Sequence, residues 1–393
     1  MKKSISILGS TGSIGLNSIK IIKKKKKLFR INILAANKNY KLICKQINEL
    51  NPEFFFINNL KVFQKVKKKF QRKNVKIINN FDFKINSLKN SEITIAAIPG
   101  IAGLKPTLEL LKKSKKLLIA NKESIICGWN LIEKLAIKNN TKIIPIDSEH
   151  FSIMKLLENQ KIQNINKIYL TASGGPFFKS KLSKLKNVKP NQAIKHPKWK
   201  MGKKISIDSS TMMNKLLEVV EAHKLFKVKL DNIKIVIHPE SLIHAVIEFK
   251  NGLHKFIYHE TSMIIPLANA IFDEEVDISL FYKKNFTQKK NFFLKNLSFF
   301  DVDSNRYPII KLKSRFNEYP STPIIINAVN EILVDQFLRK KIPFNSFYSY
   351  ILNVLNDRNY KKYAVKMPKN INQIFQIDQW SRKIVCNKLK DNA

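Results

Sequence analysis

The sequence contains little cysteine, glycine and arginine, and it has no long apolar run. Its three cysteines, Cys44, Cys127 and Cys386, stand far apart without the spacing of metal ligands. This excludes a disulfide-stabilised scaffold and indicates a reducing compartment. No apolar stretch approaches the roughly 20 residues of a transmembrane helix, and the run Ile5–Leu8 is interrupted by glycine, unlike a signal peptide. We therefore expect a cytoplasmic protein with no membrane partner.

Arginine is scarce although the chain is strongly basic. Only seven of the 72 basic residues are arginines, and the formal net charge is +43. Such a charge would ordinarily suggest nucleic acid. Recognition of phosphates and bases favours the bidentate arginine side chain, however, and here lysines are spread along the whole length. We expect no specific nucleic acid partner; a basic nucleic-acid-binding protein without activity is the alternative from another functional class.

Glycine is scarce enough for its positions to carry information. Six of the ten glycines fall in three clusters, namely Gly9, Gly12 and Gly15; Gly174 and Gly175; and Gly202. Glycine is hard to replace where the backbone needs a positive φ or where a ligand approaches it closely. The three clusters are therefore candidate ligand loops.

The pattern of the chain predicts an α/β protein with three structured parts. Strands and helices alternate over residues 1–147, which indicates a Rossmann-like, doubly wound parallel sheet. We expect an α+β catalytic and substrate domain over 148–273, a connector over 274–300 and a helical bundle over 301–393. The expected strands of the first part are Ser4–Leu8, Ile31–Ala36, Val75–Ile78, Ile93–Ile98, Lys116–Ala120 and Lys142–Ile146.

The N-terminal segment predicts a dinucleotide site. A short strand ending at Leu8 is followed by the glycine turn 9–15 and a helical run from Leu16 to Ile22. This arrangement places a pyrophosphate on a helix N-terminus. The next strand ends in Asn37-Lys38-Asn39, where a fold specific for NAD would carry an acid. A cation and two amides favour NADP instead.

Two later strands of the expected sheet end in polar residues. One leads into Asn121-Lys122-Glu123 and the other into Asp147-Ser148-Glu149. In an extended backbone Asp147 and Glu149 point the same way, and two carboxylates held so close favour a cation between them. Together with Glu218 they would supply three hard oxygen ligands for Mg²⁺ or Mn²⁺. The alternative is a polar helix N-terminus capped by Ser148.

The stretch 196–218 predicts an anion site followed by a helix with metal-ligand chemistry. A β-like run, Lys204–Ile207, precedes a helix that we expect to open behind Asp208-Ser209-Ser210, where hydroxyls and N–H groups suit a phosphate. Asn214, Lys215 and Glu218 then share a helix face. A second hydroxyl-glycine loop, 172–177, also suits an anion. His196 and His238 lie in loops beside these motifs and are candidate ligand contacts.

Seven motifs taken together resemble those of the 1-deoxy-D-xylulose 5-phosphate reductoisomerase family. They run in order through nearly the whole chain, so their combination is far more specific than any one of them. The motifs are GSTGSIG (9–15), ANKES (120–124), PIDSEH (145–150), TASGGPF (171–177), HPKWKMGKKISIDSSTMMNKLLE (196–218), IHPESLIH (237–244) and NAVNE (327–331).

The resemblance implies an NADPH- and divalent-metal-dependent oxidoreductase of isoprene biosynthesis, which converts a sugar phosphate, 1-deoxy-D-xylulose 5-phosphate, into 2-C-methyl-D-erythritol 4-phosphate. It implies that NADPH contacts Thr11, Gly12, Ser13, Ile14, Asn37, Lys38, Asn39, Asn121, Glu123 and Gly202. It implies a metal, magnesium or manganese, on Asp147, Glu149 and Glu218. The implied substrate residues are Lys122, Ser148, Glu149, Ser173, His196, Ser209, Asn214, Lys215 and Glu218, with Ser173, Ser209, Asn214 and Lys215 on the phosphate. The implied catalytic residues are Lys122, Glu149, His196 and Trp199.

The resemblance also implies that loop 196–202 is a lid, with Trp199 closing over the substrate, and that the protein is a homodimer. Three places depart from the family's pattern: Asn37 stands where glycine is usual, Glu240 replaces glutamine, and 258–264 lacks the usual Gly-x-Pro-Asp-Met-Arg. Within enzymes, the alternative is another NADP-dependent oxidoreductase of a phosphorylated aldehyde. In that case Asp147 and Glu149 would be structural.

Overall fold

The computed structural model describes residues 2–79, 88–199, 201–282 and 296–391. Contacts between Cα atoms divide the chain into two compact units. Unit 1 consists of Met1–Ser124, Trp129–Phe151 and Ser262–Lys295, and unit 2 consists of Ile125–Gly128, Ser152–Thr261 and Asn296–Ala393. The division at residues 147, 273 and 300 that the sequence suggests stays a prediction.

Unit 1 contains a sheet of seven parallel strands in the order β4-β3-β2-β1-β5-β6-β7. This confirms the predicted doubly wound sheet. The strands are β1 Lys3–Leu8, β2 Phe29–Ala36, β3 Phe54–Ile57, β4 Lys76–Ile78, β5 Ser91–Ala96, β6 Ser114–Ile119 and β7 Lys142–Pro145. Strand β3 was missing from the sequence prediction. Its four residues are all buried apolar side chains, a run too short for periodicity to separate strand from helix.

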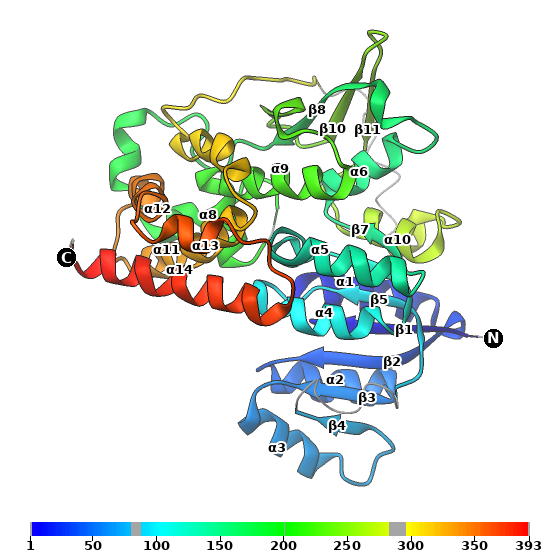
Figure 1. Ribbon diagram of the computed structural model, residues 1–393. Helices are drawn as coiled ribbons and strands as arrows, with labels where there is room; N and C mark the ends of the chain where they lie inside the picture. The colour runs from blue at the N-terminus through cyan, green and yellow to red at the C-terminus, as the bar shows by residue number, and fades with distance from the viewer. Residues whose placement is uncertain (1, 80–87, 200, 283–295, 392–393) are drawn as a thin grey trace. The chain divides into compact units, whose positions relative to one another are not determined.

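A helix follows each of the strands β1, β2, β3, β5 and β6, and in Figure 1 α2 and α3 lie beside β3 and β4. The chain forms α1 Ser13–Lys24, α2 Tyr40–Leu50, α3 Leu60–Lys69, α4 Leu104–Leu111, α5 Lys122–Lys138, α6 Ser148–Leu156 and α10 Ile264–Phe272, with short 3₁₀ turns η1 Lys26–Leu28, η3 Ile101–Gly103 and η7 Ile278–Phe281. Asparagine side chains at 39, 59 and 121 cap α2, α3 and α5. Helix α10 packs on α1, and Phe272 at its end meets Phe29 of β2 edge to face.

Unit 2 is built around a four-stranded mixed sheet in the order β11-β10-β8-β9, with helix α9 against β8 and β9 (Figure 1). The strands are β8 Ile165–Ala172, β9 Ile233–Ile237, β10 Ile243–Phe249 and β11 His254–Tyr258. The helices and turns before the C-terminal part are η4 Ile162–Asn164, η5 Leu182–Asn187, α7 Pro190–Ala193, α8 Lys203–Thr211, α9 Met213–Phe226 and η6 Leu230–Asn232. Phe300 pairs with Ile237 beyond the edge of this sheet.

The predicted β-like run 204–207 is wrong, because these residues belong to helix α8. Ser206, Ile207 and Asp208 are buried in succession, which an alternating strand does not allow. Lys204 pairs with Asp208 across one helical turn at 2.9 Å and supports the helix. The helix ends where Met212 takes a left-handed conformation with φ 69°, and α9 begins directly afterwards. The expected helix start behind Asp208 is therefore the end of α8.

The C-terminal part of unit 2 is helical, as predicted. It consists of η9 Pro308–Asn317, α11 Thr322–Leu338, η10 Phe344–Ser346, α12 Phe347–Leu355, α13 Tyr360–Ala364 and α14 Ile371–Asp391. Helix α11 contacts α8, α12 and α14. Arg382 on α14 pairs with Asp378 at 2.6 Å and with Glu331 of α11, which joins these two helices. Among the described helices, none has the length and apolar character needed to cross a membrane.

The turn after β1 explains why glycine is retained at position 9. Gly9 has φ 85°, and its N–H and that of Ser10 donate to the Ala35 carbonyl at 3.0 and 2.8 Å. A Cβ at Gly9 would lie 2.7 Å from the carbonyl carbon of Ala97. The turn therefore packs closely between β2 and the residue after β5, and a side chain at position 9 does not fit.

We expect Gly9→Ala to lower the free energy of unfolding by about 3 kcal/mol or more, since it adds left-handed strain to overpacking. Gly202→Ala is the matched control, because Gly202 has φ −66° and a Cβ there meets no atom within 4 Å. That variant should change stability by less than about 1 kcal/mol. Urea unfolding measures both, and equal stability of the two variants would contradict the packing argument.

Candidate active site

The dinucleotide turn in unit 1 presents an uncapped helix start. Helix α1 begins at Ser13, and its N-cap, Gly12, has no side chain to bond the first N–H groups. Gly12 and Ser13 are exposed, whereas Thr11 and Ile14 are partly exposed. Exposed N–H groups and the positive end of the helix dipole suit a pyrophosphate. The predicted contacts at 11–14 therefore lie where an anion can reach them.

Gln46 holds this turn in place, and the sequence analysis did not identify it. Its Nε2 donates to the Ser10 carbonyl at 2.9 Å, and its Oε1 accepts from the Ser10 hydroxyl at 2.7 Å. Both residues are buried. A glutamine in helix α2 gives no local signal of this contact, because the contact joins positions 36 residues apart.

The predicted NADP-selecting residues follow strand β2, which is the parallel neighbour of β1. Asn37, Lys38 and Asn39 are all exposed. The Asn39 side chain caps helix α2 by accepting from the Leu42 N–H at 3.2 Å. Because parallel neighbours end at the same edge of a sheet, these residues and the glycine turn leave the sheet on one side. Lys38 is the cation available there for a 2′-phosphate.

Asn121 is buried, and its side chain binds the protein's own backbone. Its amide nitrogen donates to the carbonyl oxygens of Ile98 and Gly100, the latter at 2.9 Å, and its oxygen accepts from the Ser124 N–H at 2.6 Å. It therefore caps α5 and also fixes the turn after β5. Glu123, in the first turn of α5, is buried as well. The predicted cofactor role of these two residues stays a prediction.

The ends of β6 and β7 bring Lys122 and Asp147 together in unit 1. The Lys122 ammonium lies 2.8 Å from Asp147, and its side chain is 8% exposed. Asp147 also accepts from the Ser148 N–H at 3.1 Å, and the Ser148 hydroxyl donates to Glu149 at 2.7 Å. A carboxylate oxygen of Asp147 and one of Glu149 lie within 4.8 Å of each other.

This geometry corrects the expectation of an extended backbone at 147–149. Helix α6 starts at Ser148, so Asp147 precedes the helix and Glu149 lies in its first turn. A polar helix start, which was the alternative, is thus what the structure has, although Asp147 rather than Ser148 accepts from the backbone. The two carboxylates nevertheless stay close, and they remain suitable donors for a hard cation.

In unit 2, the hydroxyl-glycine loop after β8 brings Ser173 and His196 together at 2.9 Å. His196 Nδ1 accepts from the backbone N–H groups of Lys198 and Trp199, at 3.1 and 2.9 Å, so the proton of the neutral ring lies on Nε2. Burial and the charge of Lys215 lower the pKa of His196 to about 4, which keeps the ring neutral near pH 7. Nε2–H therefore donates to the Ser173 hydroxyl.

Helix α9 presents the other predicted substrate residues of unit 2. The Lys215 ammonium lies 2.6 Å from Glu218, and Asn214 donates to the same carboxylate. This confirms that the three side chains share one face. Lys215 and Glu218 are 5% and 1% exposed, so each charge needs the other. Ser209, near the end of α8, lies beside the glycine loop, since a Cβ at Gly175 would approach its carbonyl to 3.2 Å.

Trp199 is partly exposed and packs its ring edge to face against His244, with ring centroids 6.3 Å apart. His244 stacks on His259, which belongs to the atypical segment 258–264. Gly202 is the N-cap of α8, and packing in this structure does not explain its glycine. The lid role of 196–202 stays a prediction.

His238 was a candidate ligand contact, but its surroundings indicate a structural role. Its ring is fully buried, with Nε2 accepting from the Leu242 N–H at 3.2 Å and Nδ1 facing the Ser298 carbonyl at 2.9 Å. The atypical Glu240 accepts from the N–H and hydroxyl of Ser298 at 3.2 and 3.0 Å. Both side chains therefore fasten the segment around Ser298 to the end of β9.

Two residues from the C-terminal part brace the glycine loop, and the sequence did not mark them as functional. The buried Tyr307 hydroxyl donates to the Gly174 carbonyl at 2.7 Å. The Arg306 guanidinium donates to the carbonyls of Phe177 and Ser180, at 2.9 and 2.5 Å. These contacts span more than 120 residues, so local pattern could not reveal them.

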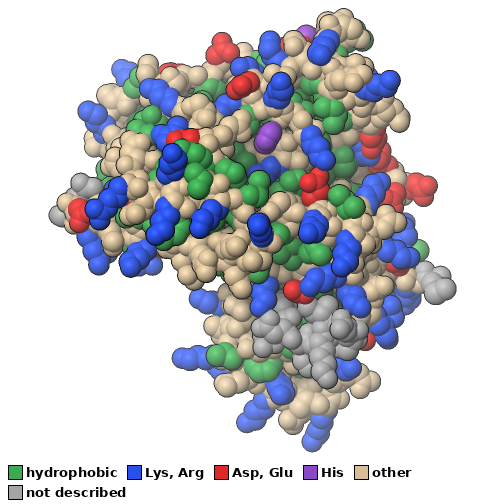
Figure 2. Space-filling view, in the orientation of Figure 1, with side chains coloured by type: hydrophobic (Ala, Val, Ile, Leu, Met, Phe, Trp, Pro, Cys, Tyr) green, Lys and Arg blue, Asp and Glu red, His purple; other side chains and the backbone are tan. Residues whose placement is uncertain are grey.

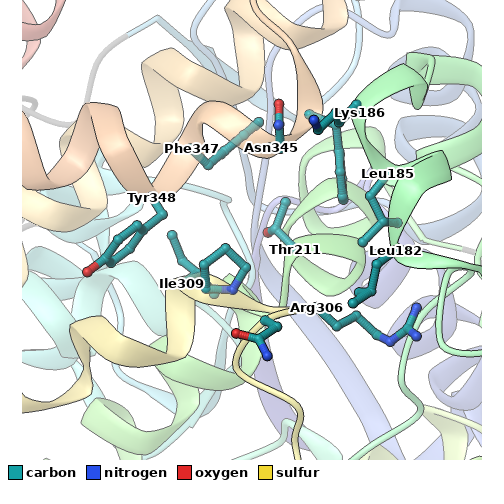
Figure 3. Close-up of a pocket in the computed structure, with 12 residues that line it drawn as sticks. Leu182, Leu185, Lys186, Thr211, Arg306, Ile309, Asn345, Phe347 and Tyr348 are labelled. Atoms are coloured by element: carbon teal, nitrogen blue, oxygen red, sulfur yellow. The ribbon is translucent and has the colours of Figure 1, made fainter.

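A cavity of about 200 Å³ in unit 2 does not coincide with the predicted site. Figure 3 shows its lining, which is mainly apolar and includes Leu182, Leu185, Ile309, Phe347 and Tyr348. None of the predicted site residues lines it. The Arg306 stem forms part of the wall, while its guanidinium is directed to loop carbonyls.

The depressed pKa of His196 predicts a pH-dependent stability. Between about pH 6.5 and pH 4 the unfolded chain binds a proton at this position that the folded chain does not bind. The free energy of unfolding should therefore fall as the pH decreases through this window. Urea unfolding at a series of pH values should show a weaker dependence in His196→Gln. Substitution of the exposed His254 by Gln serves as the control, and equal slopes for the two variants would refute the assignment.

The bonds of Asn121 predict a specific effect of Asn121→Asp. Aspartate keeps the cap on Ser124 but places a carboxylate oxygen against the carbonyls of Ile98 and Gly100. We expect unfolding to become easier by about 2 kcal/mol, together with weaker NADPH binding, measured by fluorescence titration. Asn59→Asp is the matched control, since Asn59 caps α3 through Val62 in the same unit. If both variants behave alike, Asn121 acts only as a cap.

Comparison with known proteins matches nearly the whole chain. The family described as 1-deoxy-D-xylulose 5-phosphate reductoisomerase matches residues 5–128, its C-terminal domain matches 143–226, and a further DXP reductoisomerase C-terminal domain matches 260–384. The reductoisomerase of Pelagibacter ubique (strain HTCC1062) is 42% identical over 384 residues, covering 96% of this chain and 97% of the relative. That of Clostridium novyi (strain NT) is 38% identical, covering 98% and 99%.

Solved structures give the same result. A crystal structure of DOX-P reductoisomerase in complex with NADPH, fosmidomycin and magnesium has a TM-score of 0.89 at 29% identity, covering 99% of this chain and 98% of that one. The Zymomonas mobilis enzyme in complex with NADPH has a TM-score of 0.87 at 29% identity, covering 99% of both chains. The chain belongs to the 1-deoxy-D-xylulose 5-phosphate reductoisomerase family.

Proposed function

We propose that this protein converts 1-deoxy-D-xylulose 5-phosphate into 2-C-methyl-D-erythritol 4-phosphate, with NADPH as reductant and a divalent cation. The observation that carries the proposal is the full-length similarity to reductoisomerases, including a solved complex with NADPH, fosmidomycin and magnesium. The reaction is a step of non-mevalonate isoprenoid biosynthesis. The side chains described above supply the chemistry that it needs.

NADPH binds, in this proposal, across the glycine turn of unit 1. The exposed start of α1 holds the pyrophosphate, and Lys38 with its neighbouring amides takes the 2′-phosphate. Asn121 keeps the turn after β5 in place beside this site. Glu123 and Gly202 are the remaining proposed contacts.

The proposed metal ligands are Asp147, Glu149 and Glu218. The donor set fits a hard cation, because all three are carboxylates and two of them keep oxygens within 4.8 Å of each other in unit 1. Such proximity of like charges favours a cation between them. When bound, the cation would polarise the carbonyl and hydroxyl oxygens of the substrate. Magnesium appears in solved relatives; manganese is proposed on the ligand chemistry alone.

The proposed phosphate site lies in unit 2 and is supported by the hydrogen bonds of Ser173. Its hydroxyl oxygen accepts from the Gly175 N–H at 3.1 Å and from His196. Both lone pairs are thus in use, and the hydroxyl proton is left for an acceptor such as a phosphate oxygen. Ser209 and Asn214 add polar contacts, and Lys215 adds a charge. Binding energy from the phosphate, remote from the reacting carbons, holds the substrate in position.

The remaining proposed roles concern the reacting end of the substrate. Lys122, held beside Asp147, supplies positive charge or a proton there. Ser148, hydrogen-bonded to Glu149, orients that carboxylate. Neutral His196 keeps Ser173 as a donor and anchors the start of the lid. Trp199 closes over the substrate and excludes water.

The alternatives are less well supported. An NADP-dependent oxidoreductase that only reduces a phosphorylated aldehyde would not need a metal. The close approach of the Asp147 and Glu149 carboxylates would then have no function. A nucleic-acid-binding protein would concentrate its cations, whereas Figure 2 shows Lys and Arg side chains scattered over the visible face and separated by other residues.

We also propose a homodimer in the cytoplasm. The three cysteines, all within the described residues, form no disulfide, which suits a reducing compartment.

Oxidation of NADPH, followed by absorbance with 1-deoxy-D-xylulose 5-phosphate and Mg²⁺, tests the function. We expect turnover that a chelator abolishes and that Glu149→Gln lowers by at least roughly 100-fold, because a ligand to the cation loses its charge. Glu158→Gln is the matched control, since Glu158 is exposed and pairs with Lys155. It should keep full activity.

Two results would count against the proposal. Folded protein that binds NADPH but shows no turnover would refute the activity. Turnover that survives both the chelator and Glu149→Gln would favour the metal-independent oxidoreductase.

A further inference from the structure

The NAVNE motif on helix α11 takes no part in the proposed chemistry, yet its amides are buried. Asn327 and Asn330 are both 0% exposed. Buried amides are costly unless they are hydrogen-bonded. Asn330 Oδ1 has no hydrogen-bond partner within the described part of the chain, so part of the cost of burying this amide is not offset by hydrogen bonds. What its Nδ2 group binds therefore bears on why an amide stands at this position.

Asn330 binds the helix that carries Ser209. Its Nδ2 donates to Asp208 Oδ1 at 2.8 Å, and the second oxygen of Asp208 accepts from Lys204 at 2.9 Å. Asp208 is 2% exposed. A buried carboxylate needs such donors, so the contact from α11 fixes the position of Asp208.

Asp208 directly precedes Ser209 near the end of α8. The left-handed residue Met212 then turns the chain into α9, which carries Asn214 and Lys215. A shift of Asp208 would therefore move Ser209 and the start of α9 relative to the glycine loop. That loop lies close enough for a Cβ at Gly175 to approach the Ser209 carbonyl to 3.2 Å.

Helix α11 is itself held firmly. Glu331, the next residue after Asn330, pairs with Arg382 of α14, and Arg382 also pairs with Asp378 at 2.6 Å. Thr322, at the other end of α11, bonds Tyr360 at 2.6 Å. Asn330 thus projects from a fixed helix, as a positioning contact requires.

We propose that Asn330 is a positioning residue for the substrate phosphate: by holding Asp208 it places Ser209 and the start of α9 against the glycine loop. This inference rests on the proposed role of Ser209 in phosphate binding. It assigns a function in the reaction to a residue of the C-terminal helices.

The test compares Asn330→Leu with Thr322→Val. Leucine removes the bond to Asp208, whereas valine removes one buried hydrogen bond from the same helix at nearly constant shape. We expect Asn330→Leu to raise KM for the sugar phosphate about tenfold, the effect of one charge-assisted bond, with a smaller change in kcat and unchanged NADPH affinity. Thr322→Val should lower stability and leave KM unchanged.

Exchanging the two side chains, Asn330 and Asp208, tests whether KM can be restored. Asn330→Asp sets two carboxylates against each other and should raise KM more than leucine does. Adding Asp208→Asn restores a donor–acceptor pair of the same size, and KM should return toward the original value. A purely structural role of Asn330 would instead change unfolding free energies without this pattern in KM.

Inorganic phosphate gives a readout that does not need turnover. Phosphate should raise the Tm of the unmodified protein, and both Asn330→Leu and Ser209→Ala should reduce that shift. The inference is overturned if Asn330→Leu shows the full phosphate-induced rise in Tm and an unchanged KM for the sugar phosphate. It is also overturned if Ser209→Ala shows both. If phosphate protection follows the pattern but the unmodified protein has no turnover, the proposed function fails and the inference stands.

Discussion

The cost of burying charge is the constraint on which the candidate site depends. Among the residues that the structure describes, each unit has a lysine that is almost fully buried beside a carboxylate: Lys122 with Asp147, and Lys215 with Glu218. An isolated buried ion costs several kcal/mol, so neither member of a pair is stable there alone. Each pair places an ammonium group directly beside a carboxylate that is proposed to bind the cation. They also hold two ammonium groups ready for a negatively charged substrate.

Backbone geometry explains the glycines of two turns in this chain. The protein is rich in lysine, asparagine and isoleucine, yet glycine remains at position 9, where φ is positive and the Ala97 carbonyl leaves no room for a side chain. Gly174 and Gly175 also have positive φ, at 78° and 63°. Both turns expose N–H groups or hydroxyls that suit phosphate oxygens. Positions that need glycine for conformational reasons are thus also the positions proposed to bind anions.

The sequence predicted the parallel sheet, and it nominated the candidate site residues, from signals that are local in the chain. The β1 strand, its glycine turn and the polar ends of β6 and β7 are contiguous in the chain. The prediction from sequence was wrong at Lys204–Ile207, because two alternating isoleucines are too few to distinguish a strand from a helix. It could not find Gln46, Tyr307 or the partner of Asn330, because these contacts join residues 36 to 133 positions apart. Such bonds follow from tertiary packing, which periodicity does not encode.

The contact of Tyr307 with the glycine loop has an electrostatic consequence. The peptide unit between Gly174 and Gly175 is trans, so its C=O and N–H point in opposite directions. The carbonyl end is held by the Tyr307 hydroxyl, and the N–H end faces the Ser173 hydroxyl. The positive end of this peptide dipole therefore points at Ser173 and strengthens its hydroxyl as a donor. The Tyr307 phenol, from the C-terminal part of unit 2, thus holds a peptide dipole whose positive end faces Ser173, a proposed phosphate contact.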